Sequence, residues 1–384
     1  MTNFKKLLVA QFLTAFADNA ILFTAITWVF LNADIQPWYV PALQASFLIA
    51  FVVLAPWVGA YADAHPKQNV LVKANIVKVF GAGLMIVSVE PLIAYAVVGI
   101  GAAMYSPAKY GVLPELVSEE ELVKANSWVE GATILAILAG PIIGAKIANQ
   151  SILAALWFVV GLYVVSMLIA ARIGPLKVIN RQKKKLIKEF AQICRTLLEN
   201  RRARFALIGS ALFWGSAAVS RVTLIAWVPA VLLIFDTDKI AELVIYTGIG
   251  IIVGSILAAR LFHLEDLRKA RFAAYAMGIF TIILSQMDTL LTTQAALFFV
   301  GIAGGLFIVP INAVLQDIGH QTVGAGGTVA AQNFFNNLAM LVATIIYVIV
   351  AKMGAQPVVV MAVVGGCVIA AALYIATQLK QDNN

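Results

Sequence analysis

Charged residues are scarce in this chain. Only 12% of its 384 residues are Asp, Glu, Lys or Arg, whereas 62% are hydrophobic. Soluble domains carry about 25% charged residues, so a soluble globule of this composition would lack a polar surface. The chain is therefore predicted to be an all-α membrane protein that crosses the bilayer many times.

Cysteine and histidine are also rare. Cys194 and Cys367 lie far apart, and His65, His263 and His320 fall in or near short loops. This distribution offers no disulfide framework, no metal motif and no cofactor site. The chain has no Gly-x-Ser-x-Gly motif, and no histidine is followed five residues later by Asp, so an intramembrane lipid enzyme is rejected.

Apolar windows of the length needed to cross a bilayer recur along the whole sequence. They predict twelve spans, near 7–32, 39–62, 69–89, 92–113, 122–148, 151–172, 205–234, 240–262, 271–288, 291–316, 326–351 and 355–378. Lys and Arg gather in alternate loops, before the first span and after the second and eighth, whereas the intervening loops hold mainly Asp and Glu. By the positive-inside rule both termini are expected in the cytoplasm.

A basic segment divides the spans six and six. We therefore expect an N-terminal half at 1–172, a cytoplasmic linker at 173–204 and a C-terminal half at 205–384. Apolar residues recur at helical spacing in the linker, which predicts an amphipathic helix on the inner surface. A nucleic-acid site is the alternative for these bases, but topology and anionic inner-leaflet lipid already account for them.

The two halves resemble each other weakly. Gly101 to Pro107 matches Gly304 to Pro310 at an offset of 203 residues, and Trp28 matches Trp227. The stretch that begins at Ala125 and contains Glu130 matches the stretch that begins at Ala331. These matches favour two pseudo-symmetric halves related about an axis along the membrane normal, although chance similarity between apolar sequences is the alternative.

The segment between the second and third spans contains Gly59, Asp63, Lys67 and Leu71. It resembles the signature of the major facilitator superfamily, and the resemblance implies that fold and a gating role for Gly59, Asp63 and Lys67. The segment departs from the signature at Ala64, Pro66 and Gln68. An ordinary solvated loop aspartate is the alternative for Asp63.

A narrower resemblance joins three motifs: Phe16-Ala-Asp18-Asn19, Tyr105 to Leu116, and Leu122 to Asn126. They are similar to those of the bacterial lysophospholipid transporter family. The resemblance implies flipping of lysophosphatidylethanolamine-type lipids, by alternating access, from the outer to the inner leaflet of the bacterial inner membrane. It also implies re-acylation there by an acyltransferase/acyl carrier protein synthetase, and we expect a monomer.

Charges within the apolar spans are the candidate site. Asp18 lies about 18 Å along a helix from Lys6, near mid-bilayer. A lysophospholipid phosphate suits the guanidinium of Arg221, and an ethanolamine ammonium suits Asp18 or Glu130. Asn19 or Asn312 could bond the glycerol hydroxyl. The alternative is that Asp18, Lys78, Glu130 and Arg221 pair among themselves to hold helices together.

Other polar residues are assigned to the path or to its gate. Lys78, Tyr105, Asn312, Asn333 and Asn336 are expected to line the path, or to bond other helices. Lys109 and Glu115 lie at the cytoplasmic end of the fourth span, where gating is expected.

A proton-coupled exporter or symporter of small molecules is the competing function on this fold. Asp18 and Glu130 would then carry protons, because a buried carboxyl group resists ionisation. A fold does not decide its substrate, so dependence of transport on a proton gradient would separate the two functions.

Overall fold

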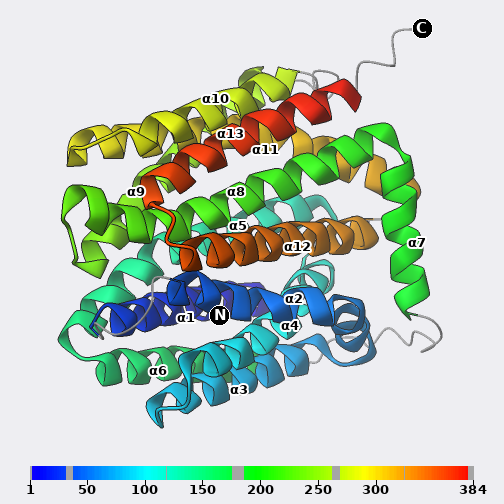
Figure 1. The fold of residues 1–384 in the computed structure, drawn as a ribbon. Coiled ribbons are helices and arrows are strands. Elements are labelled where there is room, and N and C mark those ends of the chain that lie inside the picture. Colours follow the sequence, from blue (N-terminus) through cyan, green and yellow to red (C-terminus); the bar gives the residue numbers. More distant parts are fainter. Residues whose placement is uncertain are drawn as a thin grey trace, which may run out of the picture. The chain divides into compact units, whose positions relative to one another are not determined.

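The computed structural model describes residues 2–31, 38–117, 119–174, 186–261, 269–323 and 325–378. These residues form thirteen α-helices and no strand (Figure 1). In chain order they are α1 (Asn3–Leu31), α2 (Tyr39–Ala64), α3 (Lys67–Ile86), α4 (Pro91–Leu116), α5 (Glu119–Gln150), α6 (Ile152–Ala171), α7 (Leu186–Glu199), α8 (Arg201–Leu232), α9 (Thr237–Leu261), α10 (Ala270–Ser285), α11 (Leu290–Thr322), α12 (Ala325–Lys352) and α13 (Pro357–Gln378).

Each of the twelve predicted spans coincides with one helix, and α7 is the predicted amphipathic helix of the linker. Eleven of the described helices are long and apolar enough to cross a membrane, whereas α10 has 16 residues. The span predicted at 271–288 is thus too long at its C-terminal end. There the backbone N–H of Gln286 closes the last turn on the carbonyl of Ile283, and the polar residues Gln286 and Asp288 follow.

Polar caps mark the short breaks between helices. The Ser151 side chain accepts a hydrogen bond from the backbone N–H of Ala154 and so separates α5 from α6. Asn200 does the same for α8 through the N–H of Ala203. Such caps satisfy backbone donors that a helix start leaves without partners.

The chain forms two compact units. Unit 1 comprises Met1–Ile35, Ala42–Ile187 and Asp236–Ala241, and unit 2 comprises Gln36–Pro41, Lys188–Phe235 and Glu242–Asn384. The domain bounds expected from the sequence, 1–172, 173–204 and 205–384, remain a prediction.

The same pairs of helices pack in each unit. In unit 1, α1 packs against α5 and α6, and α3 packs against α4. In unit 2, α8 packs against α12 and α13, and α10 packs against α11. The pairing that α1, α3, α4, α5 and α6 make in unit 1 therefore recurs in α8, α10, α11, α12 and α13, as expected for a fold of two related halves.

Two hydrogen bonds show the register of this repeat. The amide of Gln11 donates to Thr133 Oγ1 at 2.9 Å between α1 and α5, and the amide of Gln332 donates to Ser210 Oγ at 3.1 Å between α12 and α8. Ser210 follows Gln11 by 199 residues, and Gln332 follows Thr133 by 199 residues. Trp28 and Trp227 are separated by the same offset. The sequence match of Ala125 with Ala331 is seven residues out of this register. Seven residues are about two helical turns, so the wrong match preserves the helix face.

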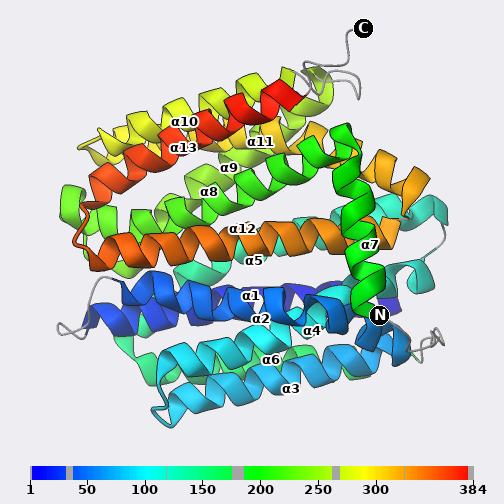
Figure 2. The ribbon, with the colours of Figure 1, turned by 45° about the vertical axis from the view of Figure 1, so that its right-hand side comes forward.

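Helix α7 is amphipathic, as predicted, but its apolar side lies on protein. Leu197 is buried in the core of unit 2, and Ile193, Cys194 and Leu198 pack against that core. Figure 2 shows α7 crossing the ends of α8 and α12 at a steep angle. The expected inner-surface helix is thus seated on the helix ends of its own unit.

Candidate functional site

A buried ion pair joins α1 and α3 of unit 1. Lys78 Nζ lies 2.7 Å from Asp18 Oδ2. The side chain of Lys78 is 1% exposed, and that of Asp18 is 18% exposed. A charge at this depth in apolar surroundings is costly without a partner, so the pairing accounts for both charges.

Hydroxyl groups complete the surroundings of this pair. The hydroxyl of Tyr163 on α6 donates to Asp18 Oδ1 at 2.8 Å, and Lys78 Nζ donates to Thr14 Oγ1 at 3.0 Å. Thr14 in turn donates to Asn75 Oδ1 at 2.8 Å. Both carboxylate oxygens of Asp18 therefore accept hydrogen bonds, and these bonds hold its rotamer.

Two aromatic rings lie beside the Lys78 ammonium. Its Nζ is 5.0 Å from the ring centroid of Tyr105 and 5.6 Å from that of Tyr163, within the range of cation–π attraction. Lys78 and Tyr105 are buried in the interior of unit 1, and their role in lining a path stays a prediction. Asp18 is the member of this cluster with the larger exposed fraction.

The remaining predicted headgroup residues occupy different places. Asn19 follows Asp18 on α1 and donates from its side chain to the Ala15 carbonyl at 2.8 Å. Glu130 lies in α5, and its side chain falls outside the described residues. Arg221 is half-buried in α8 of unit 2, so the predicted headgroup residues divide between the two units.

Unit 2 holds an uncharged polar cluster in its interior. The Gln332 amide donates to Asn312 Oδ1 at 2.7 Å and to Ser210 Oγ, and Ser210 donates to Asn336 Oδ1 at 3.0 Å. Asn312 and Asn336 therefore take part in helix–helix hydrogen bonding. Asn333 on α12 takes no part in these three hydrogen bonds, and its backbone carbonyl accepts from the Asn337 side chain at 2.7 Å.

The predicted gate residues lie at the ends of α2, α3 and α4. Lys67, the first residue of α3, forms an ion pair with Glu115 near the end of α4. The Lys67 side chain is 2% exposed, and Lys109 on α4 is also buried. Within α2, Gly59 has open space where a side chain would stand, and the side chain of Asp63 is outside the described residues.

The loop expected around Asp63 is shorter than the sequence suggested. Helix α2 continues to Ala64 and α3 begins at Lys67, so His65 and Pro66 alone connect them. The Pro66 carbonyl accepts from the N–H of Asn69 and Val70, which starts α3 directly. The backbone at Asp63 is therefore helical, and both the gating role and the solvated alternative for its side chain stay predictions.

Sequence reasoning missed several residues of the charged cluster. Thr14, Asn75 and Tyr163 bond the Asp18–Lys78 pair or its neighbours, and Ser166 accepts from the Asn75 amide at 3.2 Å. Thr14 stands four residues before Asp18, on the same helix face, which is the one local signal available. Tyr163 carries no such signal, because it is 145 residues from Asp18 in the chain.

Within the described part of the chain, no group of three or more His, Cys, Asp or Glu side chains could hold a metal ion. The polar groups of the charged cluster instead suit an ionic or hydrogen-bonding ligand: one partly exposed carboxylate held in place by hydroxyls and an ammonium. Such an arrangement can bind a cationic group at the partly exposed carboxylate.

Comparisons with known proteins agree with this architecture. The family model described as Major Facilitator Superfamily matches residues 7–344. The lysophospholipid transporter LplT of Photorhabdus laumondii is 40% identical over 355 residues, which cover 91% of this chain and 89% of that protein. LplT of Escherichia coli strain SE11 is 40% identical over 360 residues, covering 91% and 89% respectively.

Solved structures show the same fold. The nucleoside transporter NupG superimposes with a TM-score of 0.74 at 14% identity, covering 99% of this chain and 100% of that one. The human organic anion transporter MFSD10 gives 0.68 at 13% identity, covering 98% and 100%. This chain therefore belongs to the major facilitator superfamily and, within it, to the family of the bacterial LplT proteins.

Proposed function

We propose that this protein transports lysophospholipids across a bacterial inner membrane, from the outer to the inner leaflet, by alternating access. The observation that carries the proposal is 40% identity to lysophospholipid transporters over about nine-tenths of both chains. Similarity of this extent includes both six-helix halves. The buried charges supply a chemical rationale for a zwitterionic lipid.

The headgroup is the part of the substrate that needs charged partners. Arg221 is the proposed partner of the phosphate, because a guanidinium binds phosphate oxygens in a forked geometry. Asp18, with Asn19 and Glu130, is proposed to receive the ethanolamine end. The 18% exposure of Asp18 supports this assignment, since its partner Lys78 is almost fully enclosed.

Enclosure of Lys78 gives it a positioning role in this proposal. Its ammonium and the Tyr163 hydroxyl hold the two Asp18 oxygens. A carboxylate restrained in this way needs little reorganisation when a substrate ammonium approaches. Lys67, Glu115, Lys109, Gly59 and Asp63 remain the proposed gate.

The acyl chain calls for a path that stays apolar. Moving one methylene from lipid to water costs about 0.8 kcal/mol, so a chain of common length would lose on the order of 10 kcal/mol in an aqueous cavity. We therefore propose that the tail remains in hydrocarbon while the headgroup crosses. Transport should then tolerate changes of acyl length and fail when the phosphate is removed.

The test uses purified protein in proteoliposomes and labelled lysophosphatidylethanolamine of several acyl lengths. Monoacylglycerol serves as the phosphate-free control, and drugs and sugars serve as the hydrophilic panel. We expect leaflet transfer of each lysophospholipid and its loss in Arg221→Gln. Transport of the panel driven by a proton gradient, without lysophospholipid transfer, would favour the small-molecule exporter instead.

Orientation and partners belong to the same proposal. We propose that both termini lie in the cytoplasm, that the transporter is a monomer, and that a cytoplasmic acyltransferase acting on the delivered lipid is its functional partner. Labelling of Gln192→Cys, an exposed position on α7, tests the orientation. Modification from the cytoplasmic side alone is expected, and modification from the outer side would reverse the topology.

A further inference from the structure

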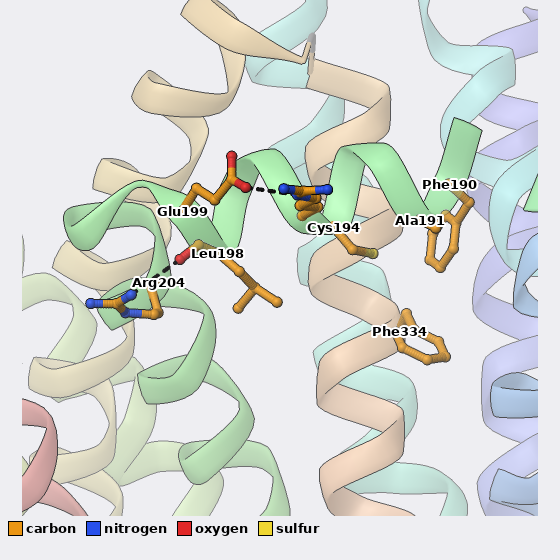
Figure 3. A pocket seen from close by; sticks show the side chains of 8 residues that line it. Phe190, Ala191, Cys194, Leu198, Glu199, Arg204 and Phe334 are labelled. Carbon is orange, nitrogen blue, oxygen red and sulfur yellow. Dashed lines mark hydrogen bonds and ion pairs between the residues drawn. The ribbon is translucent and has the colours of Figure 1, made fainter. Parts of the chain in front are cut away.

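A groove lies under α7 in unit 2. It has a volume of about 520 Å³ and is lined by residues of three helices: Phe190, Ala191, Cys194, Arg195, Leu198 and Glu199 from α7, Arg204 from α8, and Phe334 from α12. This volume falls within the range of ligand-binding clefts. Figure 3 shows Phe190, Cys194 and Leu198 projecting from α7 on the side where Phe334 lies.

The floor of the groove is apolar. The rings of Phe190 and Phe334 meet edge to face with centroids 5.4 Å apart, and Leu198 continues this surface along α7. Burial raises the pKa of the Cys194 thiol, so this side chain stays neutral. A hydrocarbon chain could lie along such a floor without meeting an ionised group.

Charge is concentrated at one end of the groove. Arg204 donates from Nη1 to the Leu198 carbonyl at 3.4 Å and so lies at the Leu198 end of the groove (Figure 3). Arg195 is exposed and forms an ion pair with Glu199 at 2.7 Å. Among the lining residues Arg195 and Arg204 are basic and Glu199 is acidic, so this rim carries a net positive charge.

The groove lies near the N-terminal ends of two helices that contain candidate membrane spans. Phe334 is about 10 Å along α12 from Gly327, the first residue of a candidate membrane span. Arg204 stands near the start of α8, whose first residue begins another candidate span. A basic rim above an apolar floor at a helix end is the arrangement that an anionic amphiphile fits.

We propose that the groove under α7 binds an anionic phospholipid of the surrounding bilayer, with one acyl chain on the Phe190–Phe334 floor and its phosphate against Arg204. Glu199 weakens the site, because it neutralises Arg195 and repels the phosphate. The bound lipid would link α7 to α8 and α12. The site is separate from the Asp18 cluster, which lies in unit 1.

The proposal can be tested with the purified full-length protein in detergent. Phosphatidylglycerol or phosphatidylethanolamine of the same acyl composition is titrated in. Bound lipid is followed by native mass spectrometry, and Tm is recorded with and without lipid. We expect retention of phosphatidylglycerol and a Tm increase that phosphatidylethanolamine and soluble glycerophosphate do not reproduce.

Two matched pairs of variants separate the groove from general attraction between charges. Arg204→Gln should weaken phosphatidylglycerol binding about fivefold, whereas Lys188→Gln removes the same charge from exposed α7 surface outside the groove and should have less effect. Ala191→Trp fills the groove and should abolish the lipid-dependent Tm increase. Gln192→Trp places the same indole ring at the neighbouring exposed position and should preserve the increase.

Glu199→Gln supplies a change in the opposite direction. Loss of its charge releases Arg195 and should tighten phosphatidylglycerol binding. The Tm of each variant is first measured in lipid-free detergent, and only variants with the wild-type value are compared for lipid binding. A lower lipid-free Tm would show that the substitution damages α7 itself. Equal losses in Arg204→Gln and Lys188→Gln, or undiminished binding in Ala191→Trp, would overturn the proposal, as would equal retention of phosphatidylethanolamine.

Discussion

Lys78 and Asp18, 60 residues apart in the chain, meet through a 2.7 Å contact between α3 and α1 in the interior of unit 1. The two partners differ in exposure, since Lys78 is almost fully enclosed and Asp18 is not. The sequence presented two alternatives for these charges, contact with the substrate headgroup and pairing between helices, and this geometry is compatible with both. It connects helices, and it also leaves one carboxylate partly exposed in a set geometry.

The asymmetry of this pair predicts unequal effects of neutralising each partner. Asp18→Asn leaves the enclosed Lys78 ammonium without its counter-ion, and breaking a buried pair in this way costs about 3–5 kcal/mol. Lys78→Met leaves a carboxylate that is partly exposed and still bonded by Tyr163, so its cost should be smaller. Tm in detergent measures both effects.

The double variant Asp18→Asn/Lys78→Met separates structure from transport. It should recover part of the Tm lost in Asp18→Asn, because no charge remains enclosed. Lysophospholipid transfer should stay absent in both variants if Asp18 contacts the headgroup. Additive losses of Tm would show that the two side chains are not energetically coupled, and recovered transfer would remove Asp18 from the site.

The Lys67–Glu115 pair predicts rescue by charge exchange. Lys67→Gln should leave Glu115 without its partner at the end of α4 and reduce transport. The exchanged variant Lys67→Glu/Glu115→Lys restores opposite charges at the same positions and should recover part of the activity. If the opposite charges do not matter, the exchanged variant should transport as poorly as Lys67→Gln.

Close packing of α9 on α11 predicts a strict size limit at one glycine. A Cβ on Gly254 would collide with the Ile302 carbonyl oxygen, so Gly254→Ala must push the two backbones apart. Overpacking in protein interiors typically costs about 1–3 kcal/mol. Gly366→Ala on α13 is the matched control, because nothing lies within 4 Å of its Cβ position. Equal Tm values for the two variants would contradict this packing.

The amide cluster of unit 2 predicts a stability loss without a charge effect. Gln332→Leu keeps a similar side-chain volume but removes the donor shared by Asn312 and Ser210. Burying unpaired polar groups costs about 1–3 kcal/mol, so Tm should fall. Asn333→Leu, outside this cluster, should leave Tm closer to wild type. A larger loss of Tm in Asn333→Leu than in Gln332→Leu would show that the cluster contributes little to holding α8, α11 and α12 together.

The sequence by itself determined the ends of the apolar helices to within four residues, except that α11 runs six residues beyond its predicted end. Apolar length decides membrane crossing, and breaks such as Ser151 or Asn200 carry their own capping chemistry. The amphipathic helix of the linker was equally visible in its periodicity. These features are local, because each depends on residues within one or two helical turns of one another.

The partners of the buried charges were decided only by the tertiary structure. Asp18 and Lys78, and Lys67 and Glu115, come together because α1, α3 and α4 pack in a particular register. The seating of α7 on the Phe334 side of α12 likewise depends on packing, since an amphipathic face is equally suited to lipid or protein. The hydropathy of the sequence indicates how deep a residue lies in a span. The residues that it contacts depend on the rotation and register of the helix, because these follow from side-chain packing between distant segments.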